Sequence, residues 1–300
     1  MILLTLFSFL HNISKNNFGG NMKPLIAYYD GRVGSPEEIT VPISDRSLFF
    51  GDAVYDAALV KDGKIFLAEE HVERLLNGAK RLKIEHKFTA ESISTEIKRF
   101  AKASGKGVYF LYFQLSRRSE GRTHSYLYAD GAALLMTLSK ANLPCPDKTL
   151  SLISVPDTRY LHCDVKTVNL LPAVMASGYA EENGADEAVF VRDGIVTECA
   201  HSNVSILKDG TLYTHPLTNR ILPGITRKHL ISYCERSRIP VKEIPFTFSE
   251  LEAADEVIVS STTKLCVRAT FLDKKPVGGK NTNLADKICN ALFDEFVHYS

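Results

Sequence analysis

Alternating apolar and polar positions near the start of the chain predict two β-hairpins. The apolar run 25–29 ends at Asp30-Gly31, a pair typical of tight turns, and a second extended run follows it. The segments 53–60 and 64–67 flank Asp62-Gly63 in the same way. We therefore expect the first domain to open with two antiparallel hairpins.

The next hundred residues change from helical to extended patterns. Apolar residues recur at helical spacing in 69–82 and 93–101, which predicts two amphipathic helices. The segments 108–115 and 132–139 are rich in aromatic and β-branched residues and predict buried strands. Between them, 117–130 is polar and long enough to be a functional loop.

The segment 140–148 contains Pro144 and Pro146 and has no hydrophobic period, so we expect a domain boundary there. The prediction is an N-terminal extension over 1–21, a small α/β domain over 22–143 and a larger domain over 144–300. In the larger domain, the pattern predicts helices at 171–183 and 284–297, and a helix that residues 222–226 lead into and that runs to about 237. It also predicts hairpins within 187–198 and 204–214 and a strand at 256–259. The fold class is therefore α+β, with two mixed domains.

Composition excludes several classes of function. The chain has 36 Lys and Arg against 35 Asp and Glu, a net charge of +1, which gives no field that would recruit nucleic acid or an anionic membrane. Its six cysteines form no C-x-x-C pair, which is typical of reduced thiols in the cytoplasm, and we expect no metal site. The apolar residues 1–10 fall short of the roughly 20 needed to span a bilayer; an export signal is the weaker alternative for 1–21.

One lysine, Lys166, stands among apolar residues near the middle of the chain. If its neighbours Val165, Val168, Leu170 and Leu171 carry the amine into a partly desolvated interior, burial lowers its pKa. A free amine attacks carbonyl groups, so one hypothesis is a Schiff-base lysine. The alternative is a lysine whose stem packs on apolar neighbours while its ammonium reaches water.

The run from Cys163 to Leu171, followed by Val196-Thr197-Glu198 and Ser202-Asn203-Val204, resembles the fold-type IV pyridoxal-phosphate enzymes. Within that family it is most similar to the D-amino-acid aminotransferases. The resemblance covers about residues 26–297 and implies two mixed α/β domains with pyridoxal 5'-phosphate at their junction.

The resemblance implies a role for each cofactor-binding residue. Lys166 would bind the cofactor aldehyde and then act as the base that moves the substrate's α-proton. Glu198 would keep the ring nitrogen protonated. The phosphate would be bound by Arg74 on the first long helix, by the backbone N–H groups of Ile225 and Thr226 at a helix start, and by the hydroxyls of Ser261 and Thr262.

Four other residues match the substrate side of the D-amino-acid aminotransferases: Tyr55, Tyr112, Arg122 and His124. Arg122 and His124 would reach the substrate carboxylate from the partner subunit of a homodimer. Two segments depart from the family pattern. The run 117–121 is more charged, and Cys199-Ala200-His201 replaces the usual small Gly and Ser residues, so His201 stands near the expected cofactor without an assigned role.

The expected function is a cytoplasmic transaminase that acts on D-amino acids and 2-oxo acids, converting D-alanine and 2-oxoglutarate to pyruvate and D-glutamate. Within the superfamily the alternatives are a branched-chain L-amino-acid aminotransferase and an aminodeoxychorismate lyase, both of which would share Lys166. From a different class, the alternative is a non-catalytic cofactor carrier or regulator.

Overall fold

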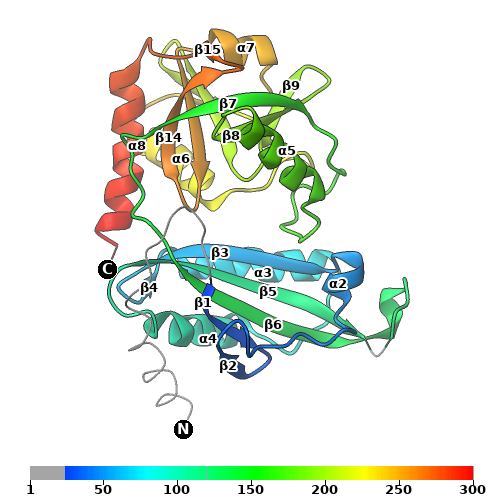
Figure 1. Ribbon diagram of the computed structural model, residues 1–300. Coiled ribbons are helices and arrows are strands. Elements are labelled where there is room, and N and C mark those ends of the chain that lie inside the picture. The colour runs from blue at the N-terminus through cyan, green and yellow to red at the C-terminus, as the bar shows by residue number, and fades with distance from the viewer. Residues whose placement is uncertain (1–23, 120, 300) are drawn as a thin grey trace. The chain divides into compact units, whose positions relative to one another are not determined.

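The computed structural model describes residues 24–119 and 121–299, which form two compact units (Figure 1). Unit 1 contains the described residues up to 143 together with 165–169, and unit 2 contains 144–164 and 170–299. The proposed C-terminal domain is continuous from 144, whereas the structure assigns 165–169 to unit 1. The proposed extension 1–21 lies outside the described residues.

Unit 1 is built on a six-stranded antiparallel sheet with the order β2-β1-β6-β5-β3-β4. The two predicted hairpins are confirmed: β1 pairs with β2, and β3 pairs with β4. The strands are β1 (Pro24–Tyr29), β2 (Arg32–Gly34), β3 (Ala53–Lys61), β4 (Lys64–Ile65), β5 (Val108–Ser119) and β6 (Ala129–Lys140).

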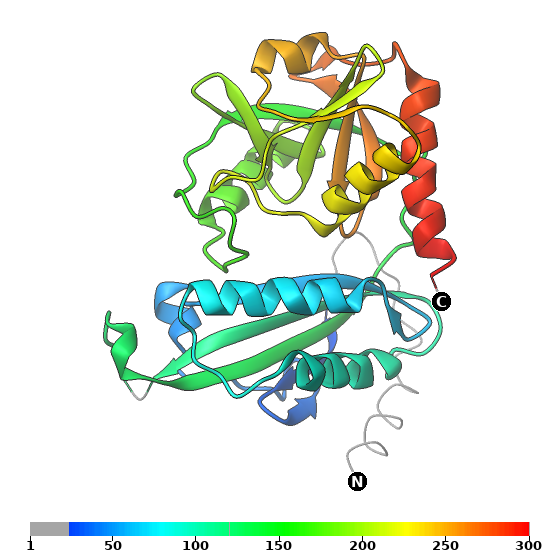
Figure 2. The same cartoon turned by 180° about the vertical axis from the view of Figure 1, so that it is seen from behind.

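Two long helices cover one face of this sheet (Figure 2). They are α3 (Ala68–Arg81) and α4 (Ala90–Lys102), and a short helix, α2 (Arg46–Phe50), precedes β3. The apolar stripes that predicted both long helices are buried in one core with the sheet, because residues three and four apart lie on the same helix face. Thr89 begins α4 with a capping box.

The predicted loop over 117–130 is wrong at both ends. Strand β5 continues to Ser119, β6 begins at Ala129, and a 3₁₀ turn occupies Tyr126–Tyr128. The charged sequence that suggested a loop forms strand because the guanidinium of Arg117 is buried and paired with Asp52 at 2.9 Å. The ion pair with Asp52 compensates for the free energy of removing the Arg117 charge from water, which usually keeps arginine out of a sheet interior.

Unit 2 contains a nine-stranded mixed sheet with the order β12-β11-β10-β13-β14-β7-β8-β9, and β15 pairs with β14. The parallel pairs are β11 with β12, β14 with β7, and β7 with β8. The strands are β7 (Thr149–Pro156), β8 (Glu187–Arg192), β9 (Ile195–Cys199), β10 (Asn203–Lys208), β11 (Thr211–Thr214), β12 (Val241–Glu243), β13 (Glu256–Ser261), β14 (Leu265–Leu272) and β15 (Lys275–Pro276).

Both faces of the central strand β13 are buried. Ile258 packs in a core with the helices α6 (Ile225–Arg236) and α8 (Thr282–Val297), whereas Val257 and Val259 point to the core on the opposite face.

The other helices of unit 2 are α5 (Leu171–Glu182) and α7 (Phe248–Ala253). The predicted α+β class is thus observed, although α2, α7 and the strands β7, β12, β14 and β15 were not predicted. No helix within 24–119 or 121–299 is long and apolar enough to cross a membrane.

Candidate active site

Lys166 lies in the short segment of unit 1 that runs along the start of strand β3. The N–H of Tyr55 donates to the carbonyl of Lys166 at 2.9 Å, and Val54 and Thr167 form an isolated antiparallel bridge. Asn169 donates to the carbonyl of Gly51 at 2.9 Å. These contacts, made by the backbone and by the side-chain amide of Asn169, fix the segment of the lysine on the sheet. Leu171, one of its expected apolar neighbours, is nevertheless 71% exposed.

The amine of Lys166 lies over an aromatic ring. Its Nζ is 4.4 Å from the centroid of Tyr55, within the range of a cation–π contact, and Lys166 is partly buried. Tyr55 stacks in turn on Tyr112, with ring centroids 5.2 Å apart. Burial and the neighbouring Tyr55 raise the pKa of Tyr112, whose neutral hydroxyl donates to Gln114 at 2.6 Å. The structure therefore brings together Lys166, Tyr55 and Tyr112, three of the predicted site residues.

Arg74, the predicted phosphate ligand, forms an ion pair with a buried aspartate. Its guanidinium donates two hydrogen bonds of 2.8 Å to Asp56 on β3, and His71 lies 2.7 Å from the same carboxylate. Burial alone would raise the pKa of Asp56, but the charge of Arg74 and the hydrogen bonds from Arg74 and His71 outweigh it, so the pKa is lowered. Asp56 therefore offsets the charge of Arg74.

His71 completes this buried group. Burial lowers its pKa and outweighs the attraction of Asp56, so the ring is neutral at physiological pH. The sequence analysis missed both Asp56 and His71. The available signal was a charged residue inside the apolar run 53–60, which implies that a partner of opposite charge is buried with it.

Arg122 and His124 lie on an exposed loop of unit 1. The guanidinium of Arg122 lies 5.2 Å from the ring centroid of Phe50, and the His124 ring meets Phe50 edge-on at 5.2 Å. Arg46 holds the loop backbone by donating to the carbonyls of Thr123 and His124. Their contacts are thus with α2 rather than with Lys166, so within unit 1 the structure separates these two residues from Lys166.

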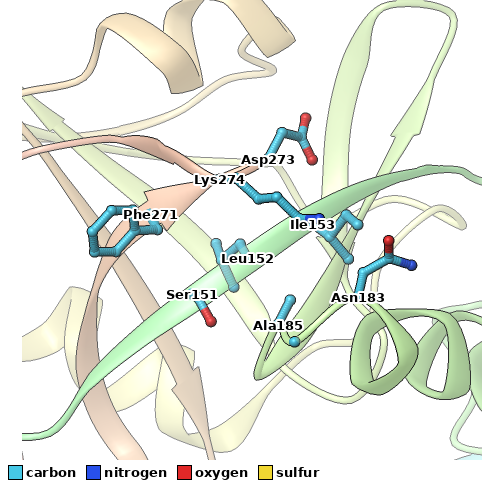
Figure 3. A pocket seen from close by; sticks show the side chains of 9 residues that line it. Ser151, Leu152, Ile153, Asn183, Ala185, Phe271, Asp273 and Lys274 are labelled. Atoms are coloured by element: carbon cyan, nitrogen blue, oxygen red, sulfur yellow. The ribbon is translucent and has the colours of Figure 1, made fainter.

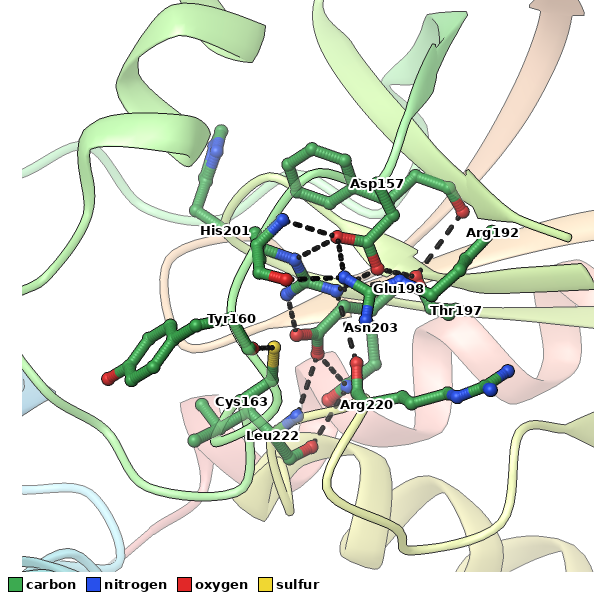
Figure 4. A network of polar contacts seen from close by, with 12 residues as sticks. Asp157, Tyr160, Cys163, Arg192, Thr197, Glu198, His201, Asn203, Arg220 and Leu222 are labelled. Carbon is green, nitrogen blue, oxygen red and sulfur yellow. Dashed lines mark hydrogen bonds and ion pairs between the residues drawn. The ribbon is translucent and has the colours of Figure 1, made fainter.

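In unit 2, Glu198 is the last residue but one of strand β9, and its buried carboxylate accepts hydrogen bonds from several donors (Figure 4). Arg159 forms an ion pair with it, Asn203 Nδ2 donates at 3.0 Å, and the N–H of Leu222 donates at 2.9 Å. Hydrogen bonds from several donors, one of them a guanidinium, hold a carboxylate in its ionised form and in one orientation. Glu198 is therefore a fixed anion, as its predicted role requires.

Arg159 links Glu198 to a second buried acid. It pairs with Asp157 at 2.9 Å, and Arg192 reaches the same carboxylate at 3.0 Å (Figure 4). Burial lowers the pKa of Arg159, but the hydrogen bonds that Arg159 donates to Asp157 and the charge of Glu198 raise it. Arg159 stood in the sequence run that carried the family resemblance, but the sequence indicated no partner for it.

The start of helix α6 forms an anion cradle. Its first residue follows Gly224, and among the described residues no side chain caps this end, so the N–H groups of Ile225 and Thr226 are available to bind an anion. Ser261 ends β13 and Thr262 follows it. Neutral N–H and hydroxyl donors of this kind fit the phosphate of pyridoxal phosphate.

Asn203 connects these parts of unit 2. Besides Glu198, its amide donates to the carbonyl of Leu222 at 3.1 Å, and it is paired in register with Ser260 of β13. A Cβ atom on Gly224 would lie 2.0 Å from Asn203 Oδ1, so only glycine fits beside it. The amide of Asn203 therefore links the carboxylate of Glu198 to the segment that begins helix α6.

Replacing Gly224 with alanine is expected to destabilise the protein by about 1–3 kcal/mol, because Asn203 must leave its two hydrogen bonds to make room. Urea unfolding measures this loss. Gly178→Ala is the matched control: no atom lies within 4 Å of a Cβ there, and alanine in the helix should stabilise the protein by about 0.5–1 kcal/mol. Equal midpoints for the two variants would contradict the packing role of Gly224.

A surface cavity of about 280 Å³ lies elsewhere in unit 2 (Figure 3). It is lined by strand β7, the end of α5 and the turn at Asp273 and Lys274. Both oxygens of Asp273 accept hydrogen bonds of 2.7 Å from Ser154. None of the predicted site residues lines this cavity. Among the described residues, no three His, Cys, Asp or Glu side chains are grouped so that they could hold a metal ion.

Comparison with known proteins places these residues in a family. Residues 53–271 match the family model described as amino-transferase class IV. The D-alanine aminotransferase of Staphylococcus epidermidis is 36% identical over 273 residues, 90% of this chain and 97% of that protein. The D-alanine aminotransferase of Bacillus licheniformis is 35% identical over 256 residues, 83% of this chain and 89% of that protein.

Solved structures with a similar fold are also aminotransferases. A branched-chain aminotransferase from Thermoproteus uzoniensis, solved with norvaline, superposes with a TM-score of 0.81 at 25% identity, covering 90% of this chain and 95% of that one. The resemblance to the fold-type IV enzymes that the Lys166 and Glu198 segments indicated is thus confirmed. Since the family model and both relatives span most of the sequence, the chain belongs to the class IV aminotransferases.

Proposed function

We propose that this protein is a pyridoxal-phosphate-dependent aminotransferase of D-amino acids, which transfers the amino group of D-alanine to 2-oxoglutarate and yields pyruvate and D-glutamate. The observation that carries the proposal is the amine of Lys166 held over Tyr55 and beside Tyr112, in a chain about 35% identical to D-alanine aminotransferases over most of its length.

When bound, pyridoxal phosphate supplies an aldehyde for amine exchange and a ring that withdraws electrons from the substrate's α-carbon. Lys166 would provide the amine that holds the aldehyde. Its Nζ would also take the α-proton from the donor and, in the second half of the reaction, return a proton to the acceptor. The partly buried position over Tyr55 limits the orientations available to this amine.

Glu198 would provide the negative charge that keeps the ring nitrogen protonated. Its carboxylate is already oriented by Arg159, Asn203 and Leu222, so it would need no reorganisation for this role. Ile225, Thr226, Ser261 and Thr262 would bind the phosphate. Arg74 would also bind the phosphate, but more weakly than the sequence suggested, because Asp56 offsets the charge of its guanidinium.

We further propose that the protein is a homodimer in which Arg122 and His124 bind the substrate carboxylate in the neighbouring subunit's site. Supporting this, the loop that bears them is exposed and carries unpaired apolar surface: Leu127 is 78% exposed and Tyr128 is 71% exposed. Arg122 contacts Phe49 and Phe50 of its own unit.

A panel of paired D- and L-amino acids with 2-oxoglutarate tests the function. We expect D-alanine to be a donor and to bleach the cofactor's absorption band in a single turnover, while L-leucine leaves the band unchanged. The second candidate is a branched-chain L-amino-acid aminotransferase, which the Thermoproteus structure favours. Bleaching by L-leucine and not by D-alanine would establish that alternative instead.

A further inference from the structure

Three charged or titratable residues connect separate segments of unit 2. Glu187 begins β8 with a fully buried side chain, His201 lies in the turn between β9 and β10, and Lys264 lies in the turn between β13 and β14. Lys264 Nζ is 2.7 Å from Glu187 Oε2 and 3.1 Å from His201 Nε2. None of the roles assigned above involves this group.

The hydrogen bonds determine the charge of each member. Lys264 donates to His201 Nε2, so that nitrogen accepts, and the ring is the neutral tautomer with its proton on Nδ1, 3.4 Å from Glu187 Oε1. Glu187 also accepts from the N–H of His201 at 3.2 Å and from Ser202 Oγ at 3.0 Å. Lys264 thus supplies the positive charge that a buried carboxylate needs.

Both turns joined by this group adjoin candidate cofactor residues. The turn with His201 directly follows Glu198 and is closed by a hydrogen bond from the Cys199 N–H to the Ser202 carbonyl at 2.8 Å. The turn with Lys264 directly follows Thr262, and the Lys264 N–H donates to Ser261 Oγ at 3.3 Å. The contact between Lys264 and His201 therefore fastens one turn to the other.

We propose that Glu187, His201 and Lys264 form a clamp that fixes the Ser261–Thr262 turn for binding the cofactor phosphate, with Lys264 as its positioning residue. Hydroxyl donors bind an anion tightly only when their geometry is set in advance, because otherwise the ordering entropy opposes binding. The clamp gives His201 a role at the position where the family has a small residue. This inference rests on the proposed function, and it concerns retention of the cofactor rather than the chemical step.

Cofactor titration of the apoenzyme tests the clamp. We expect Lys264→Met to raise the Kd for pyridoxal phosphate about tenfold while kcat at saturating cofactor stays within twofold, and Lys264→Arg to restore the affinity to within about threefold. Pyridoxal, which lacks the phosphate, should bind all variants equally. Lys275→Met, which alters an exposed lysine of β15 in the same unit, is the matched control and should bind as the unaltered protein does.

Lys264→Met leaves Glu187 buried without its lysine and can unfold the protein, so a double variant, Glu187→Gln with Lys264→Met, removes both charges. We expect this double variant to match the thermal midpoint of the unaltered apoenzyme and still bind pyridoxal phosphate about tenfold more weakly. Unchanged affinity in the double variant, equal weakening toward pyridoxal, or a large fall in kcat at saturating cofactor would each overturn the clamp. Failure of the unaltered protein to bind pyridoxal phosphate would instead refute the proposed function.

Discussion

Lys166→Ala is expected to lower kcat/KM for D-alanine with 2-oxoglutarate by at least about 10⁴-fold, because one amine is both the cofactor attachment point and the proton carrier. The fold should persist, since the backbone carbonyl of Lys166 that accepts from Tyr55 is retained. Steady-state rates measure the loss. Borohydride reduction followed by peptide mapping should label the peptide containing Lys166 in the unaltered protein and leave it unlabelled in the variant.

Lys275→Ala controls for the general effect of removing a lysine, because Lys275 is exposed on β15, and we expect it to retain full activity and labelling. Undiminished transamination by Lys166→Ala would exclude the catalytic role given to this residue. Borohydride labelling of a different peptide in the unaltered protein would move the cofactor attachment elsewhere and remove the basis of the proposed function.

Asp56→Ala is expected to cost about 3–5 kcal/mol of unfolding free energy, the range for breaking a buried ion pair by removing one partner. Asp56 is fully buried and accepts from Arg74, and loss of its carboxylate leaves Arg74 and His71 without that acceptor. Urea unfolding at neutral pH measures the change. The control is Glu73→Ala on α3, the helix that bears Arg74 and His71. It alters an exposed carboxylate, and its unfolding free energy should stay within about 0.5 kcal/mol of that of the unaltered protein.

The pH dependence separates the charge of Asp56 from its packing. The pKa of Asp56 is lowered in the folded state, so its contribution to stability is fully present above its unfolded pKa of about 4 and is lost as the pH falls toward the lower folded value. The difference in unfolding free energy between the unaltered protein and Asp56→Asn should therefore be constant near neutrality and shrink below about pH 4. A difference that does not change with pH would show that the ionised carboxylate contributes nothing.

Much of the fold followed from local patterns. The pairs Asp30-Gly31 and Asp62-Gly63 marked two hairpins, and the hairpins predicted within 187–198 and 204–214 turn at Asp193-Gly194 and Asp209-Gly210. At all four turns the structure has both residues at positive φ. Helical spacing located α3, α4, α5, α6 and α8 to within a few residues. Local spacing suffices here because one side of each element is buried and the other faces solvent.

The elements that were missed lack such a local signal. Strands β7 and β14 are neighbours in a parallel pair, and no Asp-Gly turn adjoins either of them to mark a hairpin. Helix α2 has five residues, of which only Arg46 is buried. The end of β5 was read as loop because Arg117 and Arg118 are charged, and only the burial of Arg117 against Asp52 makes strand possible there.

The sequence by itself determined the type of most helices and strands and the family, and it singled out Lys166 and Glu198 as candidate site residues. Each of these conclusions depends on residues that lie close together along the chain. Only the tertiary structure decided which partner each charged group takes. Arg74 meets Asp56 across 18 positions, Arg159 meets Glu198 across 39, and Lys264 meets Glu187 across 77. Such pairings follow from strand order and burial, since a charge removed from water must find its partner wherever the chain has folded.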